Sequence, residues 1–170
     1  MNTEKSKLEF SGAGGNWQVI DEVDDPTVIQ QQDNVSCGPA CAEMLLKALG
    51  VNDISQERIA SVSDTPVNVN ILAQAIQELD YDTSRKWIGG SLDIPGANEE
   101  ELLEVLMSTG LWMAELRQPK ARLGHLVVVN GFDTNGRLCI QDPWDKTQYK
   151  MDKYTFLEYW TLQGIYLKKL

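Results

Sequence analysis

Cysteine is scarce in this sequence of 170 residues, which contains three. An odd number of cysteines without framework spacing predicts free thiols in a reducing compartment, which excludes a small disulfide-stabilised scaffold. No apolar run approaches the roughly 20 residues of a membrane span, and the first ten residues lack a signal-peptide core. We therefore expect a chain without a membrane span that is cytoplasmic, or secreted by a route without a signal peptide.

Positive charge is also in short supply, because 15 Lys and Arg residues face 25 Asp and Glu residues, for a net charge of −10. Nucleic-acid binding requires a basic face, so nucleic acid is excluded as a partner. The 42% of hydrophobic residues fits one domain with a sizeable core. We predict a flexible N-terminal segment over residues 1–15 and a single domain over residues 16–170. The composition leaves the oligomeric state open.

The clearest pattern lies in residues 30–50, where a polar loop leads into a helix. Apolar residues recur there at intervals of three and four and form one stripe: Cys41, Met44, Leu45, Ala48 and Leu49. Pro39 suits the first helical turn, and Gly50 suits the end of the helix. Cys37 therefore falls at the helix N-terminus, where free N–H groups and the helix dipole favour a thiolate, the nucleophilic form of cysteine.

Gln31 lies six residues before Cys37 and carries a side-chain amide that can fold back beside the same helix terminus. Together with the backbone N–H of Cys37, this amide would form an oxyanion hole with two donors. The alternative is that Cys37 is a small buried hydrophobic residue, which is the more common role of a cysteine near a helix start.

The only histidine, His125, begins a predicted strand over residues 125–130, and residues 138–141 form the next strand. The turn over residues 133–136 predicts a hairpin between them. With an even loop, odd positions of the first strand share a face with even positions of the second. His125 and Asp142 then meet near the open end of the hairpin, where a carboxylate can orient the imidazole.

Together these residues resemble the papain-like cysteine peptidases. The motifs are Gln-x5-Cys-Gly-Pro-Ala, Gly-His-Leu-Val-Val-Val-x-Gly and Asp-Pro-Trp, and the resemblance spans roughly residues 28–165. The bacterial branch of bacteriocin-processing (double-glycine) peptidases is the most similar, with related effector proteases nearby. The resemblance implies the following catalytic residues: Cys37 as nucleophile, His125 as base and acid, Asp142 as its orienting partner, and Gln31 as oxyanion donor.

The remaining periodicity predicts an α+β fold, with an N-terminal helical part whose nucleophile helix packs on a C-terminal antiparallel β-sheet. The resemblance implies that this fold is papain-like. We expect helices over residues 55–62, 71–79 and 98–109 and after Asp152, and strands over residues 16–20, 111–116, 147–151 and 164–167. Residues 21–27 and 89–96 are predicted loops. Trp144, directly after Asp142-Pro143, is expected to form a wall of the substrate cleft.

The predicted function is hydrolysis of a peptide bond in a peptide or protein substrate through a Cys37 thioester. A glutamine deamidase or transglutaminase with the same triad, and a non-catalytic peptide-binding module, are the alternatives. No cofactor or metal is expected, because Cys37, Cys41, Cys139 and His125 lack the paired cysteine spacing of zinc sites. A processing enzyme, a maturation enzyme and a bacterial effector or toxin all fit this chemistry.

Overall fold

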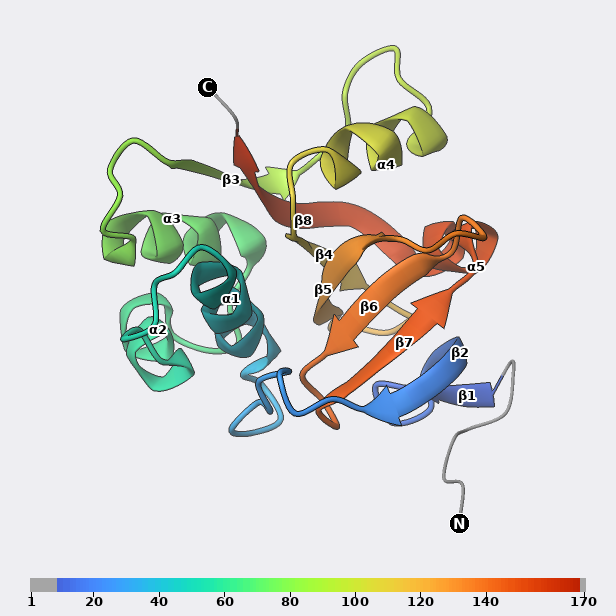
Figure 1. Cartoon of the computed structure of the whole chain (residues 1–170), viewed down its shortest axis with the longest axis horizontal. Helices are drawn as coiled ribbons and strands as arrows, with labels where there is room; N and C mark the ends of the chain where they lie inside the picture. Colours follow the sequence, from blue (N-terminus) through green and yellow to red (C-terminus); the bar gives the residue numbers. More distant parts are fainter. Residues whose placement is uncertain (1–8, 169–170) are drawn as a thin grey trace.

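The computed structural model describes residues 9–168 (Figure 1). Its elements in chain order are β1 (Glu9–Gly12), β2 (Trp17–Asp24), α1 (Cys37–Ala48), α2 (Gln56–Ser63), α3 (Val69–Leu79), β3 (Lys86–Ser91), α4 (Glu99–Met107), β4 (Trp112–Leu116), β5 (His125–Phe132), β6 (Leu138–Asp142), β7 (Thr147–Met151), α5 (Lys153–Tyr159) and β8 (Trp160–Lys168). The strands form one sheet in the order β1-β2-β7-β6-β5-β4-β8-β3. Every neighbouring pair is antiparallel, which confirms the predicted α+β architecture.

The two faces of the central strands are both buried. Helices α1, α2 and α3 gather on one side of the sheet in Figure 1, where apolar residues of α1 pack in one cluster with Leu126 and Val128 of β5. The predicted stripe is wrong at Ala48, which is exposed, and it missed Leu46, which is fully buried. On the other face, Val127 and Val129 pack with residues of α4 and α5. Strands covered on both faces are continuous apolar runs, which explains the sequence Leu-Val-Val-Val in β5.

Three helices begin at residues whose side chains accept a hydrogen bond from the first turn. Ser55 accepts from the Arg58 N–H, Asn68 from the Ile71 N–H and Asn98 from the Glu101 N–H. Each such cap contributes about 1 kcal/mol to the stability of its helix. Asp152 precedes α5 as predicted, but its side chain makes no capping hydrogen bond.

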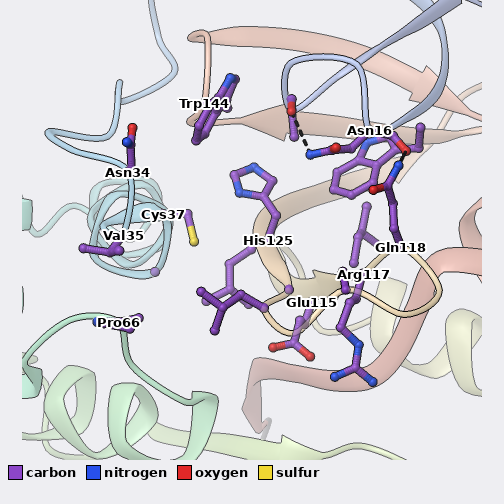
Figure 2. A pocket seen from close by; sticks show the side chains of 18 of the residues that line it. Asn16, Asn34, Val35, Cys37, Pro66, Glu115, Arg117, Gln118, His125 and Trp144 are labelled. Carbon is purple, nitrogen blue, oxygen red and sulfur yellow. Dashed lines mark hydrogen bonds between the residues drawn. The ribbon is translucent and has the colours of Figure 1, made fainter.

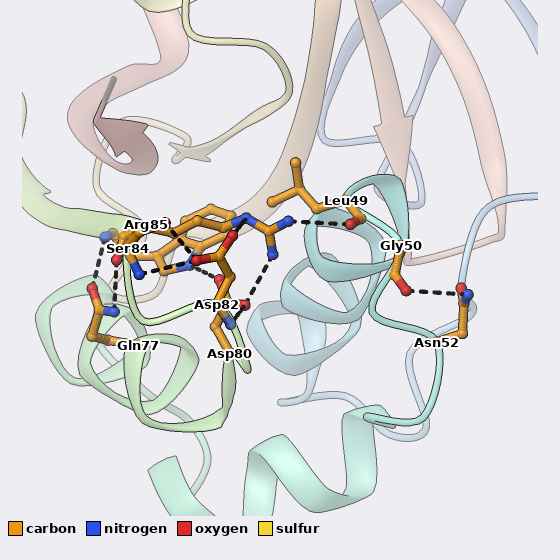
Figure 3. Close-up of polar contacts among 9 residues, drawn as sticks. Leu49, Gly50, Asn52, Gln77, Asp80, Asp82, Ser84 and Arg85 are labelled. Atoms are coloured by element: carbon orange, nitrogen blue, oxygen red, sulfur yellow. Dashed lines mark hydrogen bonds and ion pairs between the residues drawn. The ribbon is translucent and has the colours of Figure 1, made fainter. Parts of the chain in front are cut away.

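The far end of α1 is fixed by a buried carboxylate, Asp80 (Figure 3). Asp80 accepts from the Arg85 guanidinium at 3.0 Å and from the Trp87 indole at 2.8 Å. Arg85 also donates to the carbonyl of Leu49, the C-cap residue directly after α1, at 3.3 Å. This network joins the helix that starts at Cys37 to α3 and β3.

The N-terminal part differs from the prediction. Residues 9–12 form β1, which pairs with β2, and residues 13–16 form the turn between them, so the predicted flexible segment over residues 1–15 is wrong for residues 9–15. Residues 1–8 lie outside the described residues. Strand β2 also extends through the predicted acidic loop as far as Asp24. It does so because Glu22 is buried and accepts a hydrogen bond from Thr147 of β7 at 2.8 Å.

Two further predictions need correction. Strand β3 includes Gly89 and Gly90, which were expected in a loop, and it pairs with residues 163–168 of β8. Strand β8 begins at Trp160, four residues earlier than predicted. The strands of the sheet therefore come from both ends and the middle of the described chain. The prediction had placed the sheet after the helices in the sequence.

Candidate active site

Cys37 occupies the predicted position at the first residue of α1. The loop before it is held by Asp33, whose carboxylate accepts from the Val35 N–H at 3.0 Å and from the Ser36 hydroxyl at 2.7 Å. Gly38 packs tightly behind the cysteine, since a Cβ there would lie 3.0 Å from Leu72. The helix terminus is thus fixed in place from both sides of Cys37.

His125 and Asp142 meet at the open end of the β5–β6 hairpin. Their contact joins His125 Nε2 to Asp142 Oδ1 at 2.7 Å. The predicted facing of odd and even positions is also observed, because Val129 pairs with Ile140. Asp142 Oδ1 also accepts from the Trp144 N–H at 2.9 Å, so the carboxylate that orients the imidazole is itself fixed.

The site favours an ion pair between the sulfur of Cys37 and the ring of His125. Burial raises the pKa of the Cys37 thiol, but the hydrogen bond and charge of His125, with a hydrogen bond from the Leu126 backbone, lower that pKa overall. Because Nε2 of His125 is engaged by Asp142, Nδ1 is the ring nitrogen left for the thiol. These contacts favour the thiolate form of Cys37.

Asp142 and Cys37 stabilise the positively charged form of His125. Burial lowers the pKa of His125, but the Asp142 charge and hydrogen bond, together with Cys37, raise that pKa to about 10. Burial likewise raises the pKa of Asp142, while His125, the Tyr149 hydroxyl and the Trp144 backbone outweigh it and lower that pKa. Thiolate, imidazolium and carboxylate stabilise one another in this arrangement.

A cavity of about 290 Å³ opens beside Cys37 and His125. Figure 2 shows Cys37 at the end of its helix beside His125, with Trp144 above the His125 ring. The indole of Trp144 stands edge-on to His125, with ring centroids 6.2 Å apart. Glu115 and Arg117 bring opposite charges to the part of the cavity farther from Cys37.

Gln31 is buried near the site but does not line the cavity among the described residues. Its backbone N–H donates to the Pro143 carbonyl at 2.9 Å, and its side-chain Nε2 donates to the Asp33 carbonyl at 2.7 Å. Its Oε1 has no hydrogen-bond partner within residues 9–168. The structure thus places Gln31 beside the loop that holds Cys37, with one amide hydrogen engaged by that loop. Its role as oxyanion donor stays a prediction.

The other cysteines lie apart from the cavity. Cys41 is fully buried and donates to the Leu126 carbonyl at 3.3 Å, and burial raises the pKa of its thiol well above the ordinary value. Burial and Asp133 also raise the pKa of Cys139. Across the described part of the chain, no three His, Cys, Asp or Glu side chains gather as a metal site would need.

Tyr149 and Trp17 are the site residues that the motifs did not reveal. The Tyr149 hydroxyl donates to Asp142 Oδ2 at 2.6 Å, and the Trp17 indole donates to that hydroxyl at 3.0 Å. The alternation of buried and exposed residues in β7 carries the signal for Tyr149, since Tyr149 pairs with Ile140 and so shares the face of Asp142. No local pattern marks Trp17.

This site combines a thiol at a helix terminus with an imidazole and a carboxylate on a hairpin, and it lies where the helix meets an antiparallel sheet. That arrangement is the one found in papain-like cysteine peptidases, which is the class of this protein. The chain belongs to the Peptidase_C39 like family, whose model matches residues 23–166. None of the helices within residues 9–168 has the length and apolar character to cross a membrane.

The chain is similar in sequence to a known cysteine protease and in fold to two known peptidase domains. The chain is 32% identical over 160 residues to Cysteine protease effector 1 of Escherichia coli, covering 91% of this chain and 29% of that protein. The chain thus spans less than a third of that relative. Two solved peptidase domains share the fold. That of Streptococcus ComA has a TM-score of 0.64 at 24% identity, covering 84% of this chain and 97% of that one. That of Streptococcus mutans ComA has a TM-score of 0.53 at 21% identity, covering 84% and 99%.

Proposed function

We propose that this chain hydrolyses a peptide bond through a thioester on Cys37. The observation that carries the proposal is the continuous contact from Cys37 through His125 to Asp142 at the edge of an open cavity. A thiolate beside an imidazolium is the ground state that acyl transfer to sulfur requires, because the nucleophile is already deprotonated and the acid already protonated.

In the proposed reaction the Cys37 sulfur attacks the substrate carbonyl, and the carbonyl oxygen takes up the negative charge. His125 gives its proton to the leaving amine as the C–N bond breaks, which leaves a thioester and a neutral imidazole. The neutral imidazole then takes a proton from water, whose oxygen attacks the thioester. The acid product leaves, and the thiolate–imidazolium pair is restored. Asp142 holds the ring in orientation throughout and keeps its own charge.

The backbone N–H of Cys37 and the side chain of Gln31 are the proposed donors to the oxyanion. Gln31 Nε2 has two hydrogens, and the Asp33 carbonyl accepts one of them. The second hydrogen is available to an oxyanion formed beside the helix terminus. The buried position of Gln31 supports this assignment over Gln30, which is exposed and donates instead to the Trp144 carbonyl.

The proposed substrate is a peptide or an extended segment of a protein. An extended chain fits because the cavity leads away from Cys37 between two kinds of surface, apolar side chains of Val67 and Leu126 and charged side chains of Glu115 and Arg117. Trp144 forms the wall above His125. The likeness to an effector protease supports a protein substrate over a small molecule.

A survey of protein N-termini in cells that produce the chain tests this function. We expect new N-termini with the wild type and none of them with Cys37→Ala. Cys41→Ala is the matched control, because Cys41 lies one helical turn away with its thiol in the core. The same new N-termini in cells with Cys37→Ala would contradict the proposal.

A further inference from the structure

The β1–β2 hairpin lies almost entirely before residue 23, where the family match begins, yet it reaches the active site. Ala13, Asn16 and Trp17 from this hairpin line the cavity beside Cys37. The side chain of Gln118 ties the turn to the opposite wall by donating to the Asn16 carbonyl at 2.7 Å (Figure 2). The hairpin is therefore built into the site.

Trp17 makes the deepest of these contacts. It is 1% exposed, and its ring is tilted against that of His125, with a centroid distance of 5.9 Å and an interplanar angle of 32°. An indole at this distance stabilises a cation electrostatically through its ring face. Trp17 thus contacts the one group of the proposed triad that must carry positive charge.

Trp17 also acts on the opposite end of the triad. Its indole N–H donates to the Tyr149 oxygen, and Tyr149 donates to Asp142. An indole N–H can only donate, so it occupies an acceptor site on the Tyr149 oxygen and leaves the Tyr149 proton for the carboxylate. Consecutive hydrogen bonds in a buried chain also polarise and strengthen one another.

We propose that Trp17 is a positioning residue of the active site, which holds His125 in its charged state through Tyr149 and Asp142 and through its own ring face. This inference rests on the proposed peptidase function. It makes the N-terminal hairpin a working part of the site, with a task that no residue of the motifs performs.

Trp17→Phe tests the proposal, because it removes the indole N–H and keeps an aromatic ring. The matched control is Trp112→Phe. Trp112 is 0% exposed in the same apolar cluster, and its Nε1 has no hydrogen-bond partner within residues 9–168. Both variants lose a similar buried volume, but only Trp17→Phe breaks the series of hydrogen bonds that runs through Tyr149 to Asp142.

The measurement is an NMR titration of the His125 ring in the untagged chain, where the single histidine makes assignment unambiguous. We expect the wild-type midpoint far above the ordinary 6.5, a downward shift of about 0.5–1 pH unit in Trp17→Phe, and no shift in Trp112→Phe. Tyr149→Phe breaks the chain at its next link and is expected to shift the midpoint in the same direction, which keeps the test open if Trp17→Phe does not fold.

Equal midpoints in wild type and Trp17→Phe, or equal shifts in Trp17→Phe and Trp112→Phe, would overturn the role of Trp17 while leaving the peptidase function intact. A wild-type midpoint near 6.5 is a separate result. It would mean that His125 carries no stabilised charge, and it would overturn the proposed function together with this inference.

Discussion

Contacts between neighbouring members of the set favour the charged forms of Cys37, His125 and Asp142. Burial opposes the charged form of all three groups. Breaking one contact therefore leaves the next group as an uncompensated buried charge, which is costly. Removing any one of the three side chains is therefore expected to abolish the activity of the whole set, so the effects of single substitutions will not add.

Gln31 offers the sharpest prediction at the scale of single residues. Gln31→Ala is expected to lower turnover by about 10²–10³-fold with little change in KM, because an oxyanion donor acts on the transition state and not on the bound substrate. Steady-state kinetics on a substrate from the N-terminus survey provides the measurement. Gln30→Ala and Gln32→Ala are the controls, since both residues are exposed neighbours.

Two outcomes would count against this role for Gln31. A large loss in Gln32→Ala would show that the spacing to Cys37 selects the wrong glutamine. A change in KM or stability alone in Gln31→Ala would show that its hydrogen bond to the Asp33 carbonyl is its whole contribution.

Among the elements, the β5–β6 hairpin shows how alternation predicts a site despite an irregular turn. The loop between the strands has five residues, 133–137, which would reverse the expected facing. A bulge between Val129 and Phe132 adds one residue and restores it, with Gly131 at φ 79°. His125 and Asp142 face each other because the two irregularities cancel, and no sequence pattern predicts that they do.

The second half of strand β2 is a place where the sequence prediction was wrong. It contains three acidic residues, a composition typical of an exposed loop, and so it was predicted as one. Glu22 is nevertheless buried, because Thr147 on the neighbouring strand donates to its carboxylate. A buried carboxyl group whose hydrogen-bond partner lies 125 positions away leaves no local signal.

Close approach of β4 and β8 gives a prediction at the scale of elements. A Cβ on Gly164 would lie 2.2 Å from the Met113 carbonyl oxygen, which is backbone and cannot yield. Gly164→Ala is expected to destabilise the fold by about 2–4 kcal/mol. Urea unfolding measures this, with Gln163→Ala as the control on the neighbouring, partly exposed position. A free energy of unfolding equal to that of the wild type would contradict the observed packing.

At the scale of the whole molecule, the site exists because the fold joins distant segments. Cys37 and His125 lie 88 positions apart (125 − 37), and they meet where the start of α1 packs on the start of β5. A helix terminus and a strand face are local properties, so the positions of both residues could be predicted from the sequence, whereas their pairing was implied by the resemblance to papain-like peptidases. Trp17 comes from a hairpin with no strong local pattern, so its place in the site required the three-dimensional structure.

The pH dependence of Cys37 alkylation by iodoacetamide tests the central claim, that Cys37 and His125 form a thiolate–imidazolium pair. An ordinary cysteine is only a few per cent thiolate at neutral pH. The lowered pKa of Cys37 predicts that alkylation in the wild type stays fast to a lower pH than alkylation of an ordinary cysteine. In His125→Ala the supporting charge is gone while burial remains, so the titration is expected to move to higher pH. Superimposable curves for the two proteins would contradict the pairing, and the proposed active site with it.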